Sequence, residues 1–411
     1  MTSRERITAA LNYRQPDKTP IDFGGHRSSG IAVQAYAKLR RYLGLPRGNL
    51  YVYDMIQQLA LVEKDVLDIV GADVVGLSFN YLDKPEYWKD WVMDDGTPVK
   101  IPAFIDVRKT AAGNEICVDG ISVCIQKKGT LYFEQTVFPY ADSDDNVFDD
   151  LQGKLRRIMW CSIGIPPAPA GFDAEGLKIM ENNAKELRGK SDRAIYGTFG
   201  GNLMEIGQFA FRIDNFLCEL LAEPNRVHRF LDKLTDMHMG NLEKFLGAVG
   251  NYIDIIGFGD DLGMKTGPQV SVGVYNEFFK PRHKKMWKRV KELCPHLKIG
   301  LHCCGGVYPL LPHLIEAGLD AINPVQLNCA GMEPERLKRE FAGKLTLWGG
   351  GCDTSHILPA GTVSQIAEHT KKNVEILNKG GGFIFQQVHN ILAGVPPENV
   401  MAMFNAANTV E

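Results

Sequence analysis

The chain lacks both a long hydrophobic run and an excess of charge of one sign. No stretch approaches the roughly 18 consecutive apolar residues of a membrane-spanning helix, so we expect no membrane association. Lysine and arginine number 46 against 49 aspartates and glutamates, which gives a formal net charge of −3 at pH 7. Nucleic-acid-binding domains usually carry a clear basic excess. The balance of charge therefore argues against a nucleic-acid partner.

The N-terminal residues lack the apolar core of a secretory signal peptide. Thr2 and Glu5 instead have the spacing of a helix-capping box, and Pro16 is expected to end that helix. We therefore expect a cytoplasmic protein. In that compartment the nine cysteines are expected to be free thiols or metal ligands rather than disulfides.

The chain also lacks the glycine-rich motifs of dinucleotide-binding and phosphate-binding loops. It has instead a repeated pattern, in which a short apolar run ends in polar or glycine residues and a helical segment follows. Strands of a parallel sheet covered on both faces have this pattern. Seven such runs occupy residues 71–80, 194–202, 252–263, 298–306, 321–326, 345–353 and 382–390. An eighth run, at residues 19–25, either completes the set or lies outside it.

Polar residues follow nearly every one of these runs. A closed barrel places such residues at the end of each strand, whereas an open sheet gathers them at a single switch point. The pattern therefore predicts an α/β fold, a (β/α)8 TIM barrel. Residues 86–140 break the pattern and predict antiparallel β-hairpins. We expect a single barrel domain over residues 1–411, with a helical extension at 1–70 and the hairpin insertion at 86–140.

The sharpest local motif is His-x-Cys at residues 302–304. Side chains alternate along a strand with period two, so His302 and Cys304 should share one side and Cys303 should face the other. Cys352 ends a run two strands later. One imidazole and two thiolates suit a zinc ion that keeps one coordination position open, so we predict His302, Cys304 and Cys352 as metal ligands. Ordinary buried cysteines are the alternative, and Cys329 is a second candidate for the third ligand.

Other polar residues near the ends of the runs are candidates for the chemistry. Glu205 is predicted to be a fourth zinc ligand or a general acid, and Asp260 a second catalytic residue. Residues predicted to contact substrate are His26, Arg27, Asp261, Asn323, Gln326 and His389. For His26 and Arg27 the alternative is a solvated loop, and for the others it is a polar group that merely caps a strand or turn.

Along nearly its whole length the chain resembles the uroporphyrinogen decarboxylase superfamily. The segments that carry the resemblance are 4–25, 257–285, 302–326, 347–362 and 381–400. The resemblance implies the (β/α)8 fold. The decarboxylases of that superfamily have an Arg-Gln-Ala-Gly-Arg element and a Ser-Asp pair. Here the corresponding stretches are GGHRSSG (24–30) and VVGLSFN (74–80), which keep only Arg27, so porphyrinogen decarboxylation is a weak alternative.

The chain is more similar to the zinc- and corrinoid-dependent methyltransferase branch, whose motif is His-x-Cys followed far downstream by Cys. His302, Cys304 and Cys352 match that motif. The stretches DFGGHRSSG and GFGDDLG, with the hairpin insertion, are closer to the O-demethylase type. The resemblance thus implies Zn2+ as cofactor and transfer of a methyl group from a methoxylated aromatic to the Co(I) corrinoid of a partner protein.

Two further functions stay open at this point. One is methyl transfer from a methylcobamide to a thiol of the coenzyme M type, and the other is a non-catalytic barrel that binds a tetrapyrrole or corrinoid. The chain has no Asp-x-His-x-x-Gly element, so the corrinoid is expected on a separate corrinoid protein. The chain could also form an oligomer.

Overall fold

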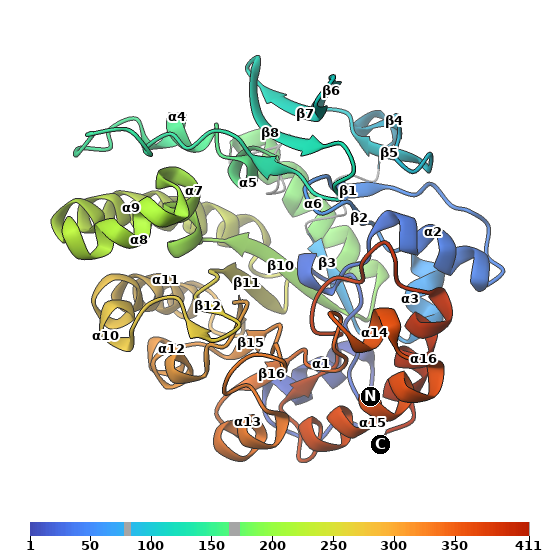
Figure 1. Cartoon of the computed structure of the whole chain (residues 1–411). Coiled ribbons are helices and arrows are strands. Elements are labelled where there is room, and N and C mark those ends of the chain that lie inside the picture. The colour runs from blue at the N-terminus through green and yellow to red at the C-terminus, as the bar shows by residue number, and fades with distance from the viewer. Residues whose placement is uncertain (78–83, 164–172, 411) are drawn as a thin grey trace.

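The computed structural model of the protein describes residues 1–77, 84–163 and 173–410. Its centre is a seven-stranded parallel sheet in the order β17-β16-β15-β14-β11-β10-β3 (Figure 1). The strands are β3 (Val74–Gly76), β10 (Ala194–Gly200), β11 (Ile255–Gly259), β14 (Lys298–His302), β15 (Ala321–Asn323), β16 (Thr346–Trp348) and β17 (Phe383–Ile384). Each strand lies inside one of the seven predicted runs. Residues 78–80 of the first run and 164–171 of a proline-rich connection lie outside the described residues.

The segment at residues 20–22 closes this sheet between β17 and β3. Phe385 donates its backbone N–H to the carbonyl of Pro20, and Asp22 donates to the carbonyl of Phe385, each at 2.8 Å. On the other side, Asp73 donates its backbone N–H to the carbonyl of Ile21 at 2.7 Å. The run at 19–25 therefore occupies the eighth position of the barrel, and the predicted TIM-barrel fold is confirmed.

Helix α1 (Ser3–Leu11) closes the amino end of the barrel. The predicted capping box is present, with Thr2 accepting from the Glu5 backbone and the Glu5 side chain accepting from Thr2. Ile7 and Leu11 of this helix are buried in one cluster with Ala194 and Ala321, the first residues of β10 and β15. Burial of each such large side chain contributes about 1.5–3 kcal/mol. Since α1 fills this end, a ligand has access to the barrel at the carboxyl ends of the strands.

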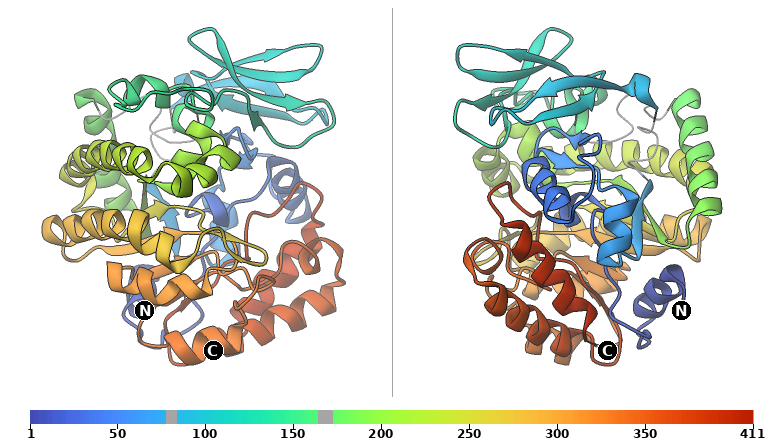
Figure 2. Two further views of the ribbon diagram at one scale, coloured as in Figure 1. Left: turned by 60° about the vertical axis from the view of Figure 1, so that its left-hand side comes forward. Right: turned by 90° about the vertical axis from the view of Figure 1, so that its right-hand side faces the viewer.

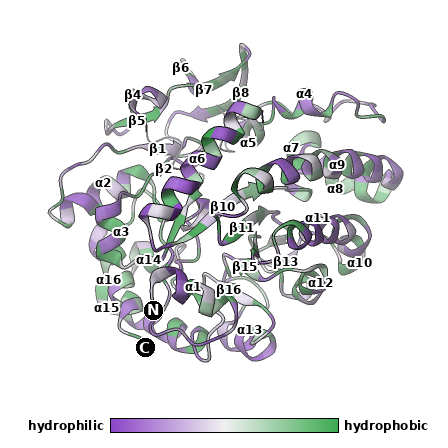
Figure 3. Ribbon diagram, turned by 180° about the vertical axis from the view of Figure 1, so that it is seen from behind, coloured by the Kyte–Doolittle hydropathy of each residue, from purple (hydrophilic) through white to green (hydrophobic). Residues whose placement is uncertain are grey.

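Helices surround the barrel, and their surfaces carry both hydrophilic and hydrophobic residues, as α9 and α11 show in Figure 3. Apolar positions recurring along one face of such a helix pack against the sheet. No helix among the described residues is long and apolar enough to cross a membrane. The helices after α1 are α2 (Val33–Tyr42), α3 (Lys64–Val70), α4 (Leu151–Leu155), α5 (Met159–Ser162), α6 (Ala174–Lys190), α7 (Met204–Phe211), α8 (Ile213–Ala222), α9 (Pro224–Val249), α10 (Val272–Val274), α11 (Lys280–Leu293), α12 (Leu311–Ala317), α13 (Pro334–Phe341), α14 (Ile357–Ala360), α15 (Val363–Leu377) and α16 (Pro397–Asn408).

The predicted hairpin insertion is present as two small antiparallel sheets. They lie together at one side of the molecule, at the top of Figure 1 and in both views of Figure 2. Gln135, in the last strand of the insertion, donates to the carbonyl of Phe209 at 2.7 Å and accepts from the backbone of Met159 at 3.2 Å. The insertion thus supports α5 and α7. The strands of the insertion are β4 (Trp88–Val92), β5 (Pro98–Pro102), β6 (Asp106–Lys109), β7 (Gly113–Val118), β8 (Ile121–Lys127) and β9 (Glu134–Gln135). Two further two-stranded sheets lie outside the insertion: β1 (Val52–Asp54) pairs with β2 (Leu59–Ala60), and β12 (Gly263–Met264) pairs with β13 (Gly267–Pro268).

Candidate metal centre

A cavity of about 200 Å³ lies at the carboxyl ends of the barrel strands. Thr198 and Gly200 of β10, Gly259 of β11 and His302 of β14 all line it, and each lies in the last part of its strand. Active sites of (β/α)8 enzymes lie at this end of the barrel because the loops that follow the strands converge there. The cavity is therefore the candidate functional site.

Aromatic side chains form much of the cavity wall. The rings of Phe199 and Phe258 meet edge to face with their centroids 5.5 Å apart, and those of Trp160 and Phe209 are 6.4 Å apart. Tyr196 adds a fifth ring. Aromatic pairs at these separations are mutually attractive and give a wall of fixed shape. The cavity thus has the form of an aromatic slot with polar groups at a few positions.

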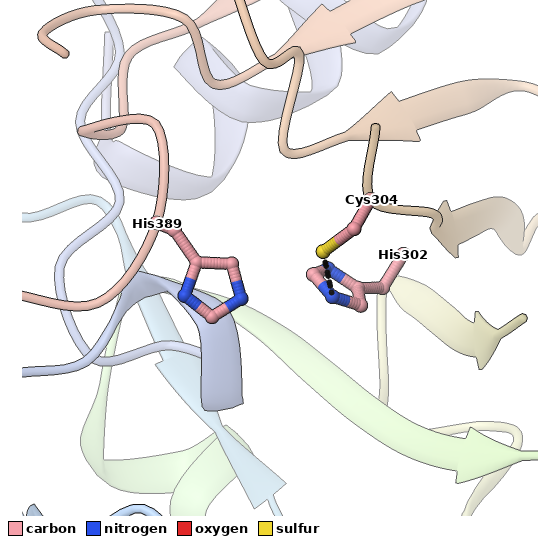
Figure 4. Close-up of side chains that lie close together, drawn as sticks. All are labelled: His302, Cys304 and His389. Atoms are coloured by element: carbon pink, nitrogen blue, oxygen red, sulfur yellow. Dashed lines mark hydrogen bonds between the residues drawn. The ribbon is translucent and has the colours of Figure 1, made fainter. Parts of the chain in front are cut away.

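Three potential metal ligands meet at this cavity. Among the described residues, the ligand atoms of His302, Cys304 and His389 all lie within 4.8 Å of one another. Cys304 Sγ is 3.3 Å from His302 Nε2. Figure 4 shows both imidazole rings and the thiol directed into one space from two separate segments of the chain. One thiolate and two imidazoles are a ligand set that zinc accepts, with a position left for substrate, so these residues fit a zinc ion.

The loop after β14 places its two cysteines on opposite sides, as the alternation of side chains predicts. Cys303 is buried and accepts a hydrogen bond from the backbone of Leu262 at 3.3 Å. Cys352 does not join the group of His302, Cys304 and His389. It is fully buried, and its Sγ is directed toward the carbonyl of Asp353 at 4.0 Å. The assignment of Cys352 as a ligand stays a prediction, and the structure supplies His389 as a competing third ligand.

Burial shapes the protonation of the three grouped residues. It lowers the pKa of His302, and it lowers the pKa of His389 to about 3. It also raises the pKa of the Cys304 thiol well above its usual range, with a further contribution from the Asp261 carboxylate. Both imidazoles are therefore neutral at pH 7, as metal binding requires, and a cation would have to displace the thiol proton.

A carboxyl group with an unusual pKa lies in the same cavity. Glu205, the second residue of α7, has its pKa raised well above the ordinary value, first by burial and then by the nearby carboxylates of Asp261 and Asp260. Asn202 donates a hydrogen bond to it. Burial and the two neighbouring carboxylates therefore favour the protonated form of Glu205, which can offer a proton inside the cavity. A carboxylic acid held neutral in this way is a recurrent feature of general-acid catalysis.

The two aspartates after β11 have different positions. Asp261 lines the cavity and accepts a hydrogen bond from the Cys304 backbone at 2.7 Å. Asp260 is fully buried behind it, accepts from the Glu205 backbone at 3.0 Å and pairs with His283 at 3.2 Å. Asp260, predicted to be catalytic, is thus placed where it supports Glu205 rather than where it would touch a ligand.

The predicted substrate-binding residues fall into two sets. His26, Arg27, Asp261 and His389 line the cavity. Arg27 forms an ion pair with Asp54 at 2.5 Å, and its guanidinium lies 5.6 Å from the centre of the Trp160 ring. Asn323 and Gln326 are not among the lining residues: Asn323 bonds to His302 at 2.7 Å, and Gln326 accepts from the backbone of Gly305. These two amides hold the loop that carries His302 and Cys304.

The sequence reasoning missed two parts of this site. Trp160 and Phe209 come from helical segments outside the strand runs, where an aromatic residue carries no signal that separates a cavity wall from core packing. His389, predicted to contact substrate, lies with its ring beside His302 and Cys304 and is also a potential metal ligand. The position of His389 after the last apolar run is a signal that could have marked it as a third ligand. The family motif indicates Cys352 for that role instead.

Comparisons with known proteins agree with this architecture. A methyltransferase from Methanosarcina mazei superimposes with a TM-score of 0.59 at 18% identity, over 99% of this chain and 98% of that one. At this identity the likeness shows the fold alone. An endo-1,4-beta-xylanase from Caldicellulosiruptor owensensis (TM-score 0.34, 14% identity, 55% of this chain and 81% of that one) and a GH2 beta-galacturonidase from Eisenbergiella tayi (0.33, 10%, 78% and 57%) are too distant to inform the site. No curated protein matches the chain.

The profile of the uroporphyrinogen decarboxylase (URO-D) family matches residues 202–410, just over half of the chain. This stretch contains Glu205 and all three grouped ligands. It also contains five of the seven sheet strands, which are β11, β14, β15, β16 and β17. The family match and the closed barrel agree with the relationship that the sequence motifs imply. The chain belongs to the uroporphyrinogen decarboxylase family.

Proposed function

We propose that this protein is a zinc-dependent methyltransferase that moves a methyl group from a methoxylated aromatic to the Co(I) corrinoid of a partner protein. One observation carries the proposal: a thiol and two neutral imidazoles converge, and both imidazoles belong to residues that line a cavity with aromatic rings in its wall. We propose His302, Cys304 and His389 as the zinc ligands. The partner would dock at the carboxyl end of the barrel, since α1 fills the amino end.

The size and lining of the cavity favour an aryl methyl ether as the methyl donor. A cavity of about 150 Å³ is enough to admit benzene, and this one measures about 200 Å³. A thiol of the coenzyme M type carries a sulfonate, which needs a free cationic partner. Arg27 already pairs with the buried Asp54, so its charge is compensated. The aromatic slot therefore supports the phenyl ether over the thiol.

The chain's own residues would divide the chemistry as follows. Zinc in this site would polarise the ether oxygen and stabilise the negative charge that develops there. The aromatic rings hold the phenyl group and exclude water from it. When the methyl–oxygen bond breaks, its electron pair stays on the phenolate oxygen, and the electron pair of Co(I) in the partner's corrinoid would form the new bond to the methyl carbon. Glu205, neutral because its pKa is raised, gives its proton to that oxygen and becomes a carboxylate.

Replacing Glu205 with glutamine is expected to slow turnover by roughly 10²- to 10⁴-fold, the usual contribution of general acid catalysis. The amide keeps the size of the side chain but has no acidic proton. Zinc content should stay at that of the unchanged protein, because Glu205 acts as an acid and not as a ligand. Steady-state rates and metal analysis check both points, and a fully active variant would contradict the acid role.

The pH profile gives an independent check on the same group. Because the pKa of Glu205 is raised, its proton is kept to a higher pH than that of an ordinary carboxyl group and is lost as the pH rises through the raised value. The rate of the unchanged enzyme should therefore fall on the alkaline side. The glutamine variant should lose that alkaline limb and keep a low, flat rate.

The function itself is tested by incubating zinc-loaded protein with a reduced corrinoid protein and a panel of methyl donors. We expect methylation of the corrinoid, followed by its absorbance, with methoxylated aromatics and not with methyl thiols. The matched control is the same protein freed of zinc by a chelator. Turnover with methyl thiols alone would favour the coenzyme M type of reaction, and binding of a corrinoid without turnover would favour a carrier.

A further inference from the structure

A chain of buried amide groups lies behind His302 and ends at two backbone carbonyls. Its members are Asn323, the last residue of β15, and Gln386, which follows β17. Asn323 is 4% exposed and Gln386 is 0% exposed, so solvent water cannot satisfy the hydrogen-bonding groups of either side chain. Each hydrogen bond in such a dry chain has to be made by the protein itself.

The two carbonyls set the direction of every bond in the chain. The backbone oxygen of Ser28 can only accept, so Gln386 directs its Nε2 toward it, at 3.0 Å. Gln386 then presents Oε1 to Asn323, whose Nδ2 donates to it at 2.8 Å. The same Nδ2 donates to the carbonyl of Trp348 at 2.9 Å. Both hydrogens of the Asn323 amide are thus used, and its orientation is fixed from two sides.

The oxygen of Asn323 is consequently the atom that faces His302. It lies 2.7 Å from His302 Nδ1 and 2.6 Å from the hydroxyl of Ser28, which donates to it. An amide oxygen only accepts, so Nδ1 of His302 has to carry a hydrogen. In a neutral imidazole the other nitrogen then has a free lone pair. That nitrogen, Nε2, is the one 3.3 Å from Cys304 Sγ.

We propose that Asn323 is the positioning residue of the metal centre, which holds His302 as its Nδ1–H tautomer with the Nε2 lone pair presented beside Cys304. The relevance to zinc rests on the proposed function, but the tautomer is a property of the metal-free protein. Partners of this kind behind a ligating histidine fix its ring orientation and its tautomer. An unconstrained neutral imidazole prefers the opposite tautomer, with its hydrogen on Nε2. The Nδ1–H form of His302 can therefore be distinguished from that of a histidine without such a partner.

Nuclear magnetic resonance of metal-free protein with ¹⁵N-labelled histidine reads the tautomer directly. At pH 7.5 we expect one ring, assigned to His302 by its absence from His302→Gln protein, to be protonated at Nδ1 only. Protonation at Nε2 instead would overturn the proposal. This measurement uses neither zinc nor a methyl donor. The tautomer can therefore be refuted while the proposed function holds, and the proposed function can be refuted while the tautomer holds.

Substitutions separate positioning from a merely structural role. Asn323→Leu removes the acceptor, so we expect His302 to lose its Nδ1–H signature and the Kd for Zn2+ alone to rise about 10- to 100-fold. Asn323→Asp keeps an acceptor at this position and should keep the tautomer, even if the lost donor lowers stability. Gln387→Leu is the matched control. Gln387 is also buried and donates to the carbonyl of Gly30 at 3.2 Å, but it takes no part in the hydrogen bonds that link Gln386, Asn323 and His302.

The results for these variants together test whether Asn323 positions His302. Loss of the tautomer and of zinc affinity in Asn323→Leu, with both retained in Gln387→Leu, supports the proposal. If Asn323→Leu does not fold, retention of the Nδ1–H form in Asn323→Asp supports it and a switch to Nε2–H overturns it. Equal loss of zinc affinity in Asn323→Leu and Gln387→Leu would also overturn it, because the effect would then follow from any buried amide.

Discussion

Replacing His302 with alanine or Cys304 with serine is expected to remove zinc from the protein and to abolish methyl transfer. Their ligand atoms are 3.3 Å apart, and among the described residues only His389 joins them as a third potential ligand. A Lewis-acidic metal ion contributes several kcal/mol to the stabilisation of transition-state charge. At about 1.4 kcal/mol for each factor of ten, the rate should fall by roughly 10³-fold or more.

Metal analysis and the corrinoid methylation assay together check this result. Cys329→Ser is the matched control, since Cys329 is a buried thiol outside the group and its sulfur is 3.7 Å from Asn328 Oδ1. That variant should keep about one zinc per chain and near-normal turnover. Zinc bound as before in His302→Ala and Cys304→Ser would show that the metal lies elsewhere and would contradict this ligand set.

Replacing His389 with alanine is expected to weaken zinc binding and methyl transfer strongly, whereas Cys352→Ser is expected to leave both near normal. The reason is geometric: His389 reaches the group, and the Cys352 thiol packs against Asp353 and Thr370 instead. Loss of one of three protein ligands should reduce the rate by an amount similar to that in His302→Ala.

The two variants form a crossed test, because the family motif makes the opposite prediction. If Cys352→Ser loses zinc and His389→Ala keeps it, the ligand set inferred from the sequence is correct and the one inferred from the structure is not. Cys352 is fully buried, so a polar hydroxyl in its place could lower stability. Thermal unfolding of both variants shows whether any loss of zinc follows from unfolding.

Much of the fold could be predicted from the sequence. Strands buried on both faces produce continuous apolar runs, and these runs were visible even though several of the strands are only two or three residues long. Closure of the barrel was harder to foresee. The apolar run at 19–25 leaves open whether it completes the barrel, and the segment at 20–22 joins the sheet through only a few backbone hydrogen bonds.

The third ligand illustrates why the site was only partly predictable. By strand order, the loop after β16 lies nearer to β14 than the loop after β17 does, which favours Cys352. Gly349 and Gly350 adopt φ angles of 118° and 77°, however, and the chain turns there before Cys352. Such angles suit glycine and redirect the backbone. The position of a side chain after such a turn depends on packing against α15, which a motif does not record.

The same limit explains why Asp260 and Asn323 could not be placed in advance. A polar residue at a strand end can face the cavity, as Asp261 does, or turn behind it, as Asp260 does. Both positions satisfy the hydrogen-bonding needs of the backbone. Polar residues at a strand end therefore indicate where the site lies, but only the structure shows which of their side chains face the cavity.

The most direct measurement is an anomalous difference map, collected at the zinc absorption edge from crystals of the zinc-loaded protein. We predict one strong peak at the cavity wall, about 2.0–2.1 Å from a ring nitrogen of His302 and of His389 and about 2.3 Å from Cys304 Sγ. A peak bound by Cys352 with His389 turned away, or no peak near His302 and Cys304, would contradict this metal centre.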